Sequence, residues 1–142
     1  MDEKKLLIFM PSVEDGGVEK NFYLVSNYLG TKLKNVSVIT ANRSIKNNLN
    51  RKIKLIGPKS TIWNTNSRYP KYLICLIYLF SFLLCNRNTL ILSFQANAYA
   101  SLLAKIFCTK IITRSNSSSE GWSKGSIKKF LYKIFLKLPN QI

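Results

Sequence analysis

Short runs rich in apolar residues recur along the chain, and polar segments separate them. Runs of this kind are typical of parallel strands buried on both faces, because such strands have no solvent-facing side. The second run is also β-branched, which favours a strand. We therefore predict five strands, at residues 6–10, 36–40, 53–56, 89–94 and 110–114.

Helical periodicity fills most of the intervals between these strands. After the first strand, apolar residues recur at i, i+4, i+7 and i+11 and form one face of a helix. Gly30 is placed to end that helix, and Asn97 is placed to cap a later one. Residues 60–68 fit neither pattern. We predict helices over residues 18–29, 72–85, 98–107 and 126–138.

The alternation of strands and helices predicts the fold class. Repeated strand–helix–strand units imply a parallel sheet with right-handed crossovers. We expect an α/β fold, a Rossmann-like open parallel sheet of about five strands with helices on both faces. The length of 142 residues fits a single domain over 1–142, and 46% hydrophobic residues are enough for a packed core.

The apolar run at residues 72–85 has two interpretations. Ser81 is its only polar residue. A helix of that length spans about 21 Å, which is short of the roughly 30 Å hydrocarbon core of a bilayer. The length favours a buried helix in the core of the domain, and a membrane-embedded hairpin is the alternative.

Charge is unevenly distributed along the chain. Lysine and arginine number 22 and acidic residues 6, for a formal net charge of +16, and five of the acids lie in the first 19 residues. The basic remainder favours anionic partners, namely phospholipid, nucleic acid or phosphorylated substrates. A general compositional bias toward Lys, Asn and Ile explains the same charge without a partner.

Several kinds of chemistry are excluded because the sequence lacks the residue types that they need. The sequence has no histidine, which removes His-based catalytic triads and His metal ligands. Cys75, Cys85 and Cys108 lie in apolar stretches without C-x-x-C spacing. We expect three buried free thiols in a reducing compartment, and neither a metal nor another cofactor.

Polar loops follow three of the predicted strands, and ligands of open α/β sheets bind beside the carboxyl ends of strands. The first loop places Gly16 and Gly17 directly before a helix. Two glycines allow a phosphate to approach the N–H groups of a helix N-terminus, although such a pair is also common in simple turns. Because G-x-G-x-x-G and a Walker lysine are absent, the loop predicts a phosphate neighbour but neither NAD nor ATP.

Several of these segments resemble one enzyme family, the family 4 glycosyltransferases, in the bacterial form that builds surface polysaccharides. The first part of the resemblance is a strand, a Gly-Gly-x-Glu loop and a long helix; the second is a pair of polar loops later in the chain. It covers nearly the whole sequence and is weakest between Arg43 and Arg68. The matching segments are KLLIFMPS at 5–12, GGVEK at 16–20, VSVIT at 36–40, LSFQAN at 92–97, KIITRSN at 110–116 and EGW at 120–122.

The resemblance implies a retaining, metal-independent hexosyltransferase of the GT-B type, in which two Rossmann-like domains face a cleft. Gly16 and Gly17 would then approach the diphosphate of a nucleotide-sugar donor. The acceptor, a glycan or a lipid-linked sugar, would bind to later loops of this domain. The resemblance assigns no catalytic residue, and the acceptor-loop histidine of many members is missing here. The candidate acceptor-binding residues are Ser93, Gln95, Asn97, Arg114 and Asn116.

The family's donor-binding second domain has no counterpart in residues 1–142. We therefore expect this chain alone to be inactive in sugar transfer and to need that domain in cis or from a separate polypeptide. A non-catalytic remnant is one alternative. A basic module that binds nucleic acid or a membrane surface is the other, and charge is its only support.

The last predicted helix, residues 126–138, combines an apolar face with several lysines. Such a helix can lie on an anionic membrane surface, or it can pack on the sheet with its lysines in solvent. Packing is the favoured interpretation. We expect a cytoplasmic protein, with a peripheral position on the inner face of the plasma membrane as a further expectation because lipid-linked acceptors are found there.

Overall fold

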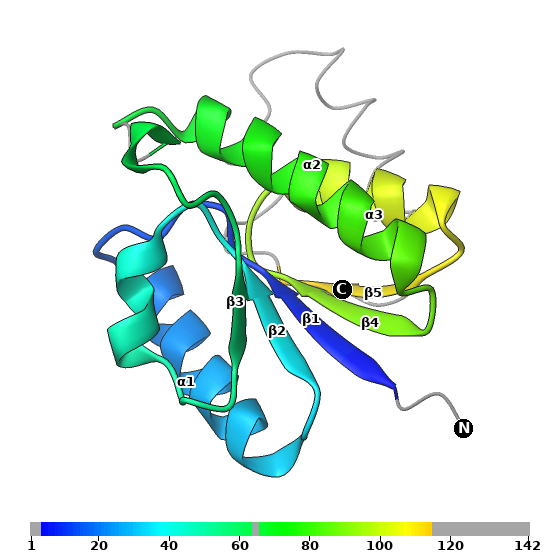
Figure 1. The fold of residues 1–142 in the computed structure, drawn as a ribbon, viewed down its shortest axis with the longest axis horizontal. Coiled ribbons are helices and arrows are strands. Elements are labelled where there is room, and N and C mark those ends of the chain that lie inside the picture. Colours follow the sequence, from blue (N-terminus) through cyan, green and yellow to red (C-terminus); the bar gives the residue numbers. More distant parts are fainter. Residues whose placement is uncertain (1–3, 64–65, 115–142) are drawn as a thin grey trace.

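The computed structural model describes residues 4–63 and 66–114, which form an open sheet with helices on both faces (Figure 1). The predicted helix over 126–138 and the candidate residue Asn116 lie outside the described residues. The strands are β1 (Lys5–Phe9), β2 (Val36–Ile39), β3 (Lys54–Ile56), β4 (Thr89–Ser93) and β5 (Lys110–Thr113). The helices are α1 (Gly17–Lys32), α2 (Arg68–Cys85) and α3 (Asn97–Ile106), and two 3₁₀ turns are η1 (Arg43–Asn48) and η2 (Thr61–Trp63).

All five strands are parallel, in the order β3-β2-β1-β4-β5. The Rossmann-like α/β fold predicted from the sequence is therefore confirmed. Each predicted strand agrees with the structure to within one residue at either end. The inner strands β2, β1 and β4 are covered on both faces of the sheet, which explains why their residues are mostly apolar.

The two faces of the sheet pack against different helices, because successive strand residues point to opposite sides. Ile8 of β1 belongs to a buried cluster with Phe22 of α1, on the face that also carries η1. Its neighbour Phe9 belongs to a second cluster with Leu79 of α2, on the face that carries α2 and α3 (Figure 1). Burying a side chain of this size contributes roughly 1.5–3 kcal/mol, so each face is held by its own core.

Gly30 does not end α1, contrary to the sequence prediction. The helix continues to Lys32 and closes where the Leu33 N–H donates to the Leu29 carbonyl oxygen, 2.8 Å away. A Cβ on Gly30 would lie 2.8 Å from Cγ1 of Ile53. The glycine is therefore needed for the close approach of α1 to the segment before β3.

Two other helix starts also differ from the predictions. Asn97 is the first residue of α3 and its side chain does not cap the helix, because Ala96 occupies the cap position. Helix α2 begins at Arg68, four residues before the predicted run. Pro70 is tolerated there because N–H groups in a first turn have no partner within the helix.

The three cysteines have different environments. Cys75 is buried on the inner face of α2, and burial raises the pKa of its thiol to about 12. Cys85 and Cys108 are exposed, so the expectation that all three thiols are buried is wrong for these two. Cys85 is the last residue of α2, and Cys108 lies in the turn between α3 and β5. Both cysteines lie at or just after the C-terminal end of an apolar helix, where the chain is exposed.

We predict that iodoacetamide at about pH 8 alkylates Cys85 and Cys108 but not Cys75 in the native protein, because only the thiolate form reacts. Peptide mass spectrometry measures the modification at each site. Urea-unfolded protein is the control and should be modified at all three cysteines. Equal rates at all three cysteines under native conditions would contradict the packing of α2 on the sheet.

Candidate functional site

The strand order places a topological switch point between β1 and β4. From β1 the chain crosses to β2 on one side, and β4 lies on the other side of β1. The loops that leave the carboxyl ends of these two strands therefore diverge, and the crevice between them is where ligands of open α/β sheets bind. Backbone hydrogen bonds hold the edge in register: the Phe94 N–H donates to the Phe9 carbonyl oxygen at 3.0 Å, and the Ala41 N–H to that of Pro11 at 3.0 Å.

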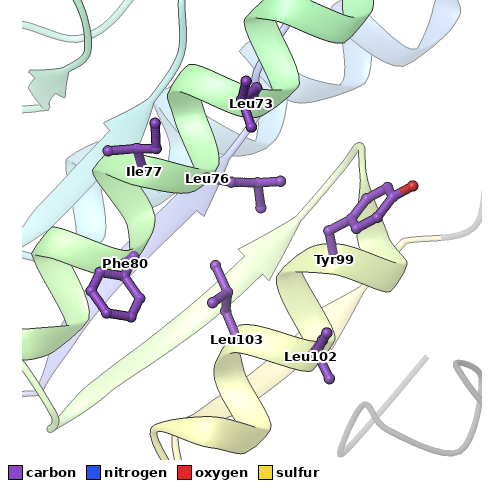
Figure 2. Close-up of a pocket in the computed structure, with 7 residues that line it drawn as sticks. All are labelled: Leu73, Leu76, Ile77, Phe80, Tyr99, Leu102 and Leu103. Carbon is purple, nitrogen blue, oxygen red and sulfur yellow. The ribbon is translucent and has the colours of Figure 1, made fainter.

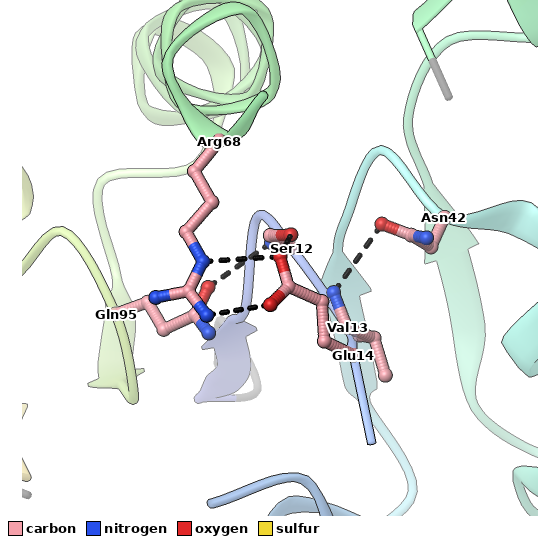
Figure 3. Close-up of polar contacts among 6 residues, drawn as sticks. All are labelled: Ser12, Val13, Glu14, Asn42, Arg68 and Gln95. Carbon is pink, nitrogen blue, oxygen red and sulfur yellow. Dashed lines mark hydrogen bonds and ion pairs between the residues drawn. The ribbon is translucent and has the colours of Figure 1, made fainter. Parts of the chain in front are cut away.

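Side chains from both neighbouring strand ends fix the β1 loop (Figure 3). The Ser12 N–H donates to Oε1 of Gln95, 3.1 Å away, and the Val13 N–H donates to Oδ1 of Asn42, 3.3 Å away. Gln95 was predicted to bind an acceptor, and the structure places it beside the β1 loop with its carbonyl oxygen used to hold that loop. The loops after β1, β2 and β4 are thus one connected unit.

An ion pair joins the β1 loop to the start of α2 (Figure 3). Arg68 donates from Nε and Nη2 to the two carboxylate oxygens of Glu14, at 3.0 and 2.5 Å. The hydrogen bond from Arg68 holds the pKa of Glu14 below its usual range, and the same bond raises the pKa of Arg68. Because the two side chains are 57% and 39% exposed, the pair contributes at most about 1 kcal/mol of stability. Its effect is to position the loop.

Lys71 lies one turn after Arg68 on the inner face of α2 and is only 4% exposed. Its charge also helps to lower the pKa of Glu14, so it acts on the same edge of the sheet. Lysine is rarely buried without a specific reason. Neither Arg68 nor Lys71 is among the site residues that the sequence predicts. A signal was available for Lys71, which precedes Cys75 and Leu79 at a spacing of four and so shares their buried face.

A second polar network joins the ends of β4 and β5. The buried Ser93 hydroxyl donates to Oδ1 of Asn97 at 2.8 Å, and Nδ2 of Asn97 donates to the Arg114 carbonyl oxygen at 2.8 Å. Ser93, Asn97 and Arg114 were three of the predicted acceptor-binding residues. The structure brings them together, and it uses the polar groups of Ser93 and Asn97 to tie the two strand ends to each other.

The residue between Gln95 and Asn97 has an unusual backbone conformation. Ala96 has a φ of 53°, in the left-handed region that non-glycine residues rarely adopt. Such a conformation costs of order 1–3 kcal/mol and persists only when its surroundings enforce it. Here the Ser12–Gln95 and Ser93–Asn97 hydrogen bonds hold the two neighbours of Ala96. Strain of this kind is typical of functional loops.

Arg114 presents its guanidinium over the ring of Phe94, with its central carbon 5.8 Å from the ring centroid. Phe94 is in turn fixed by an edge contact with Phe22, whose ring centroid lies 5.7 Å away. A guanidinium on an aromatic face is restrained in orientation and still has N–H groups for a ligand. Arg114 therefore provides an oriented cation at the carboxyl end of β5.

Gly16 and Gly17 have different surroundings. A Cβ on Gly16 would lie 2.7 Å from Oε2 of Glu19, whereas a Cβ on Gly17 would meet nothing within 4 Å. Gly16 is the cap residue of α1, and no side chain caps the helix. The Glu19 carboxylate thus crowds the Gly16 side of the α1 N-terminus, whereas the Gly17 side has room for a ligand.

A cavity of about 330 Å³ lies beside Gly16, between α1 and η1. Its lining includes Glu14, Asp15 and Glu19, together with Lys20. Carboxylates repel an anion, but they accept hydrogen bonds from hydroxyl groups. The cavity itself therefore suits a neutral polyol, and an anionic group fits better outside it. Among the described residues, no group of acids and cysteines is arranged to hold a metal.

We predict that Asn97→Ala destabilises the domain by about 1–3 kcal/mol, because it leaves the Arg114 carbonyl oxygen without its side-chain donor and removes one of the two acceptors of the Ser93 hydroxyl. Urea unfolding measures the difference. Asn21→Ala is the matched control: its amide donates only to the Gly17 carbonyl within α1 and is exposed, so a change below about 0.5 kcal/mol is expected. Equal stability of the Asn97 variant and the wild type would show that the network does not hold the strand ends.

No protein-family model matches the sequence, and no curated protein matches it significantly. The fold class rests on the structure, which agrees with a Rossmann-like arrangement. The resemblance to family 4 glycosyltransferases rests on the quoted segments alone. It remains a prediction about what the carboxyl edge of the sheet binds.

Proposed function

We propose that this chain forms the acceptor-side wall of a glycosyltransferase cleft and that its carboxyl edge also contacts the diphosphate of a nucleotide-sugar donor. The observation that carries the proposal is the connected unit at the switch point. There the β1 and β4 loops are joined by the Ser12–Gln95 hydrogen bond, beside the uncapped N-terminus of α1. A crevice at this position is the general ligand site of open parallel sheets.

The local charges divide this edge into two regions. The acid-lined cavity beside Gly16 suits the hydroxyl groups of a sugar, because carboxylates accept hydrogen bonds from them. The Gly17 side of the α1 N-terminus is free of crowding and suits a phosphate. In this arrangement the donor diphosphate lies toward α1, and the sugar hydroxyls lie in the cavity.

Sugar transfer from a diphosphate donor requires stabilisation of the charge that develops on the leaving phosphate. Helix N–H groups at Gly17 would supply part of it, and the candidates for cationic help are Lys71 in the first turns of α2 and Arg114 at the end of β5. The resemblance assigns the remaining donor contacts to a second Rossmann-like domain, in cis or from a separate polypeptide. A retaining, metal-independent hexosyl transfer to a glycan or lipid-linked acceptor on the cytoplasmic side is the reaction proposed.

We predict that Gly17→Ala weakens nucleotide-sugar binding by about tenfold, since the added methyl group separates a phosphate from the helix N–H groups. Calorimetric titration with UDP-glucose and with GDP-mannose, each alone, measures the affinity. Fold stability should not fall, because the new Cβ meets no atom within 4 Å. Gly30→Ala is the matched control: it clashes with Ile53 and should cost about 1–3 kcal/mol of stability with unchanged affinity.

Lys71→Met serves as a second variant for the same titration. It removes the charge while filling a similar volume, and stability should be maintained because an apolar side chain avoids the cost of burying a charge. Weaker binding with an unchanged melting temperature supports the proposal. If neither nucleotide sugar binds the wild type, or if both variants bind as well as it does, the proposal fails and a non-catalytic role becomes the better explanation.

A further inference from the structure

An apolar surface covers the outer sides of α2 and α3. Large side chains of these two helices are exposed, and several of them line one common groove. Soluble domains rarely expose large apolar patches without a binding partner. We call this surface the α2/α3 face and define it by Leu73, Ile77, Phe80, Leu84, Leu102 and Ile106, all of them exposed.

Helix α2 is apolar on two opposite sides. Its inner side carries Cys75 and Leu79, which are fully buried in the core. Its outer side carries Leu73, Ile77 and Leu84, which are 62%, 53% and 53% exposed. A surface helix of a soluble domain normally has a polar outer side. The outer side of α2 therefore favours contact with an apolar partner, and the described residues do not provide one.

Length and composition alone would allow α2 to cross a membrane, and it is the one helix among the described residues that meets both criteria. Its inner side, however, packs on the sheet against Phe9 and Ile39. A helix held in this way lies flat beside the domain core and cannot leave it without exposing that core. The arrangement fits a helix that lies in the plane of a membrane interface.

The two helices enclose an apolar groove of about 310 Å³ (Figure 2). Figure 2 shows Leu76 and Leu103 pointing toward each other across its floor. At one end, the rings of Phe80 and Phe107 meet edge to face, with centroids 5.3 Å apart. The only side-chain polar group among the labelled residues is the Tyr99 hydroxyl. The groove can therefore accept hydrocarbon.

A cationic groove of about 830 Å³ runs along the other flank of α2 and includes two α2 side chains, Tyr78 and Phe82. No acidic residue lines it. The acids that the structure describes, Glu14, Asp15 and Glu19, lie in the β1 loop and the start of α1. Apolar and cationic surfaces thus adjoin on one helix. The basic side chains that line the groove are Lys5, Lys34, Arg43, Lys52, Lys54 and Lys59.

We propose that the α2/α3 face docks on an anionic lipid bilayer. The outer side chains of α2 and α3 insert among the lipid headgroups, and the cations of the neighbouring groove bind headgroup phosphates. A bilayer offers an apolar interior and an anionic surface in one partner, which matches both surfaces of α2. Membrane binding through apolar burial together with electrostatic attraction is a general mode of peripheral attachment. The proposal is independent of sugar transfer.

The test is co-sedimentation of the full chain with vesicles of phosphatidylcholine containing about 30% phosphatidylglycerol. Leu73→Ser with Ile77→Ser should reduce the partition coefficient by at least about tenfold. The matched control is Leu24→Ser with Tyr28→Ser, two α1 side chains that are 70% and 60% exposed, and it should bind like the wild type. Circular dichroism verifies that both variants are folded, as expected for exposed positions.

Two double variants that each remove two positive charges test whether the cationic groove contributes to vesicle binding. Lys54→Gln with Lys59→Gln should weaken binding to the anionic vesicles several-fold, by about a factor of five per charge at most. Lys32→Gln with Lys46→Gln, two cations outside the groove lining, should weaken it less. Vesicles of pure phosphatidylcholine should bind all proteins poorly, and about 0.5 M salt should reduce binding of the wild type.

Three results would overturn the proposal. The first is equal binding of the α2 and α1 serine variants to anionic vesicles. The second is a wild-type dimer in light scattering that the Leu73 and Ile77 substitutions dissociate, because the face would then be covered by a second copy. The third is binding to double-stranded DNA but not to vesicles, lost with Lys54 and Lys59 but not with Leu73 and Ile77, which would make the groove a nucleic-acid site.

Discussion

The parallel pairing of β1 with β4 is the contact on which the rest of the structure depends. It runs in register from Lys5 opposite Thr89 to Phe9 opposite Ser93, and it places two strands side by side whose following loops diverge. That divergence creates the crevice at the carboxyl edge. It also requires α2 to carry the chain from β3, at one edge of the sheet, back across to β4.

Helix α2 therefore contributes to three parts of the molecule: the carboxyl edge of the sheet, the core and the α2/α3 face. Its first turn reaches the carboxyl edge, where Arg68 binds Glu14 and Lys71 adds a second cation. Its inner side closes the core through Cys75 and its neighbours. Its outer side supplies most of the α2/α3 face. The proposed membrane-docking face and the proposed sugar-binding crevice thus both involve α2. Docking on a bilayer would therefore also orient the crevice relative to a lipid-linked acceptor.

The sequence was sufficient to predict the strands, because each contains mainly apolar or β-branched residues and lies between polar segments. It was insufficient wherever a residue's role depends on a partner distant in sequence. Gly30 faces Ile53, and Arg68 binds Glu14 across 54 residues. The exposure of Cys85 was missed for a similar reason: an apolar helix looks buried in the sequence whether one of its sides or both are covered. Gln95 was identified as a site residue, but its bond to the β1 loop could be seen only in the fold.

Amide chemical-shift mapping with UDP-glucose and GDP-mannose tests most directly whether the crevice at the carboxyl edge is the functional site. The proposal predicts that the largest shifts cluster in the β1 loop and the α1 N-terminus, at Gly16 and Gly17, and in the β4 loop around Gln95. Shifts confined to the cationic groove, at Lys34, Lys52 and Lys54, would mean that an anionic ligand is held by charge in that groove and not in the crevice. That result, or the absence of any shift, would contradict a nucleotide-sugar site at the switch point.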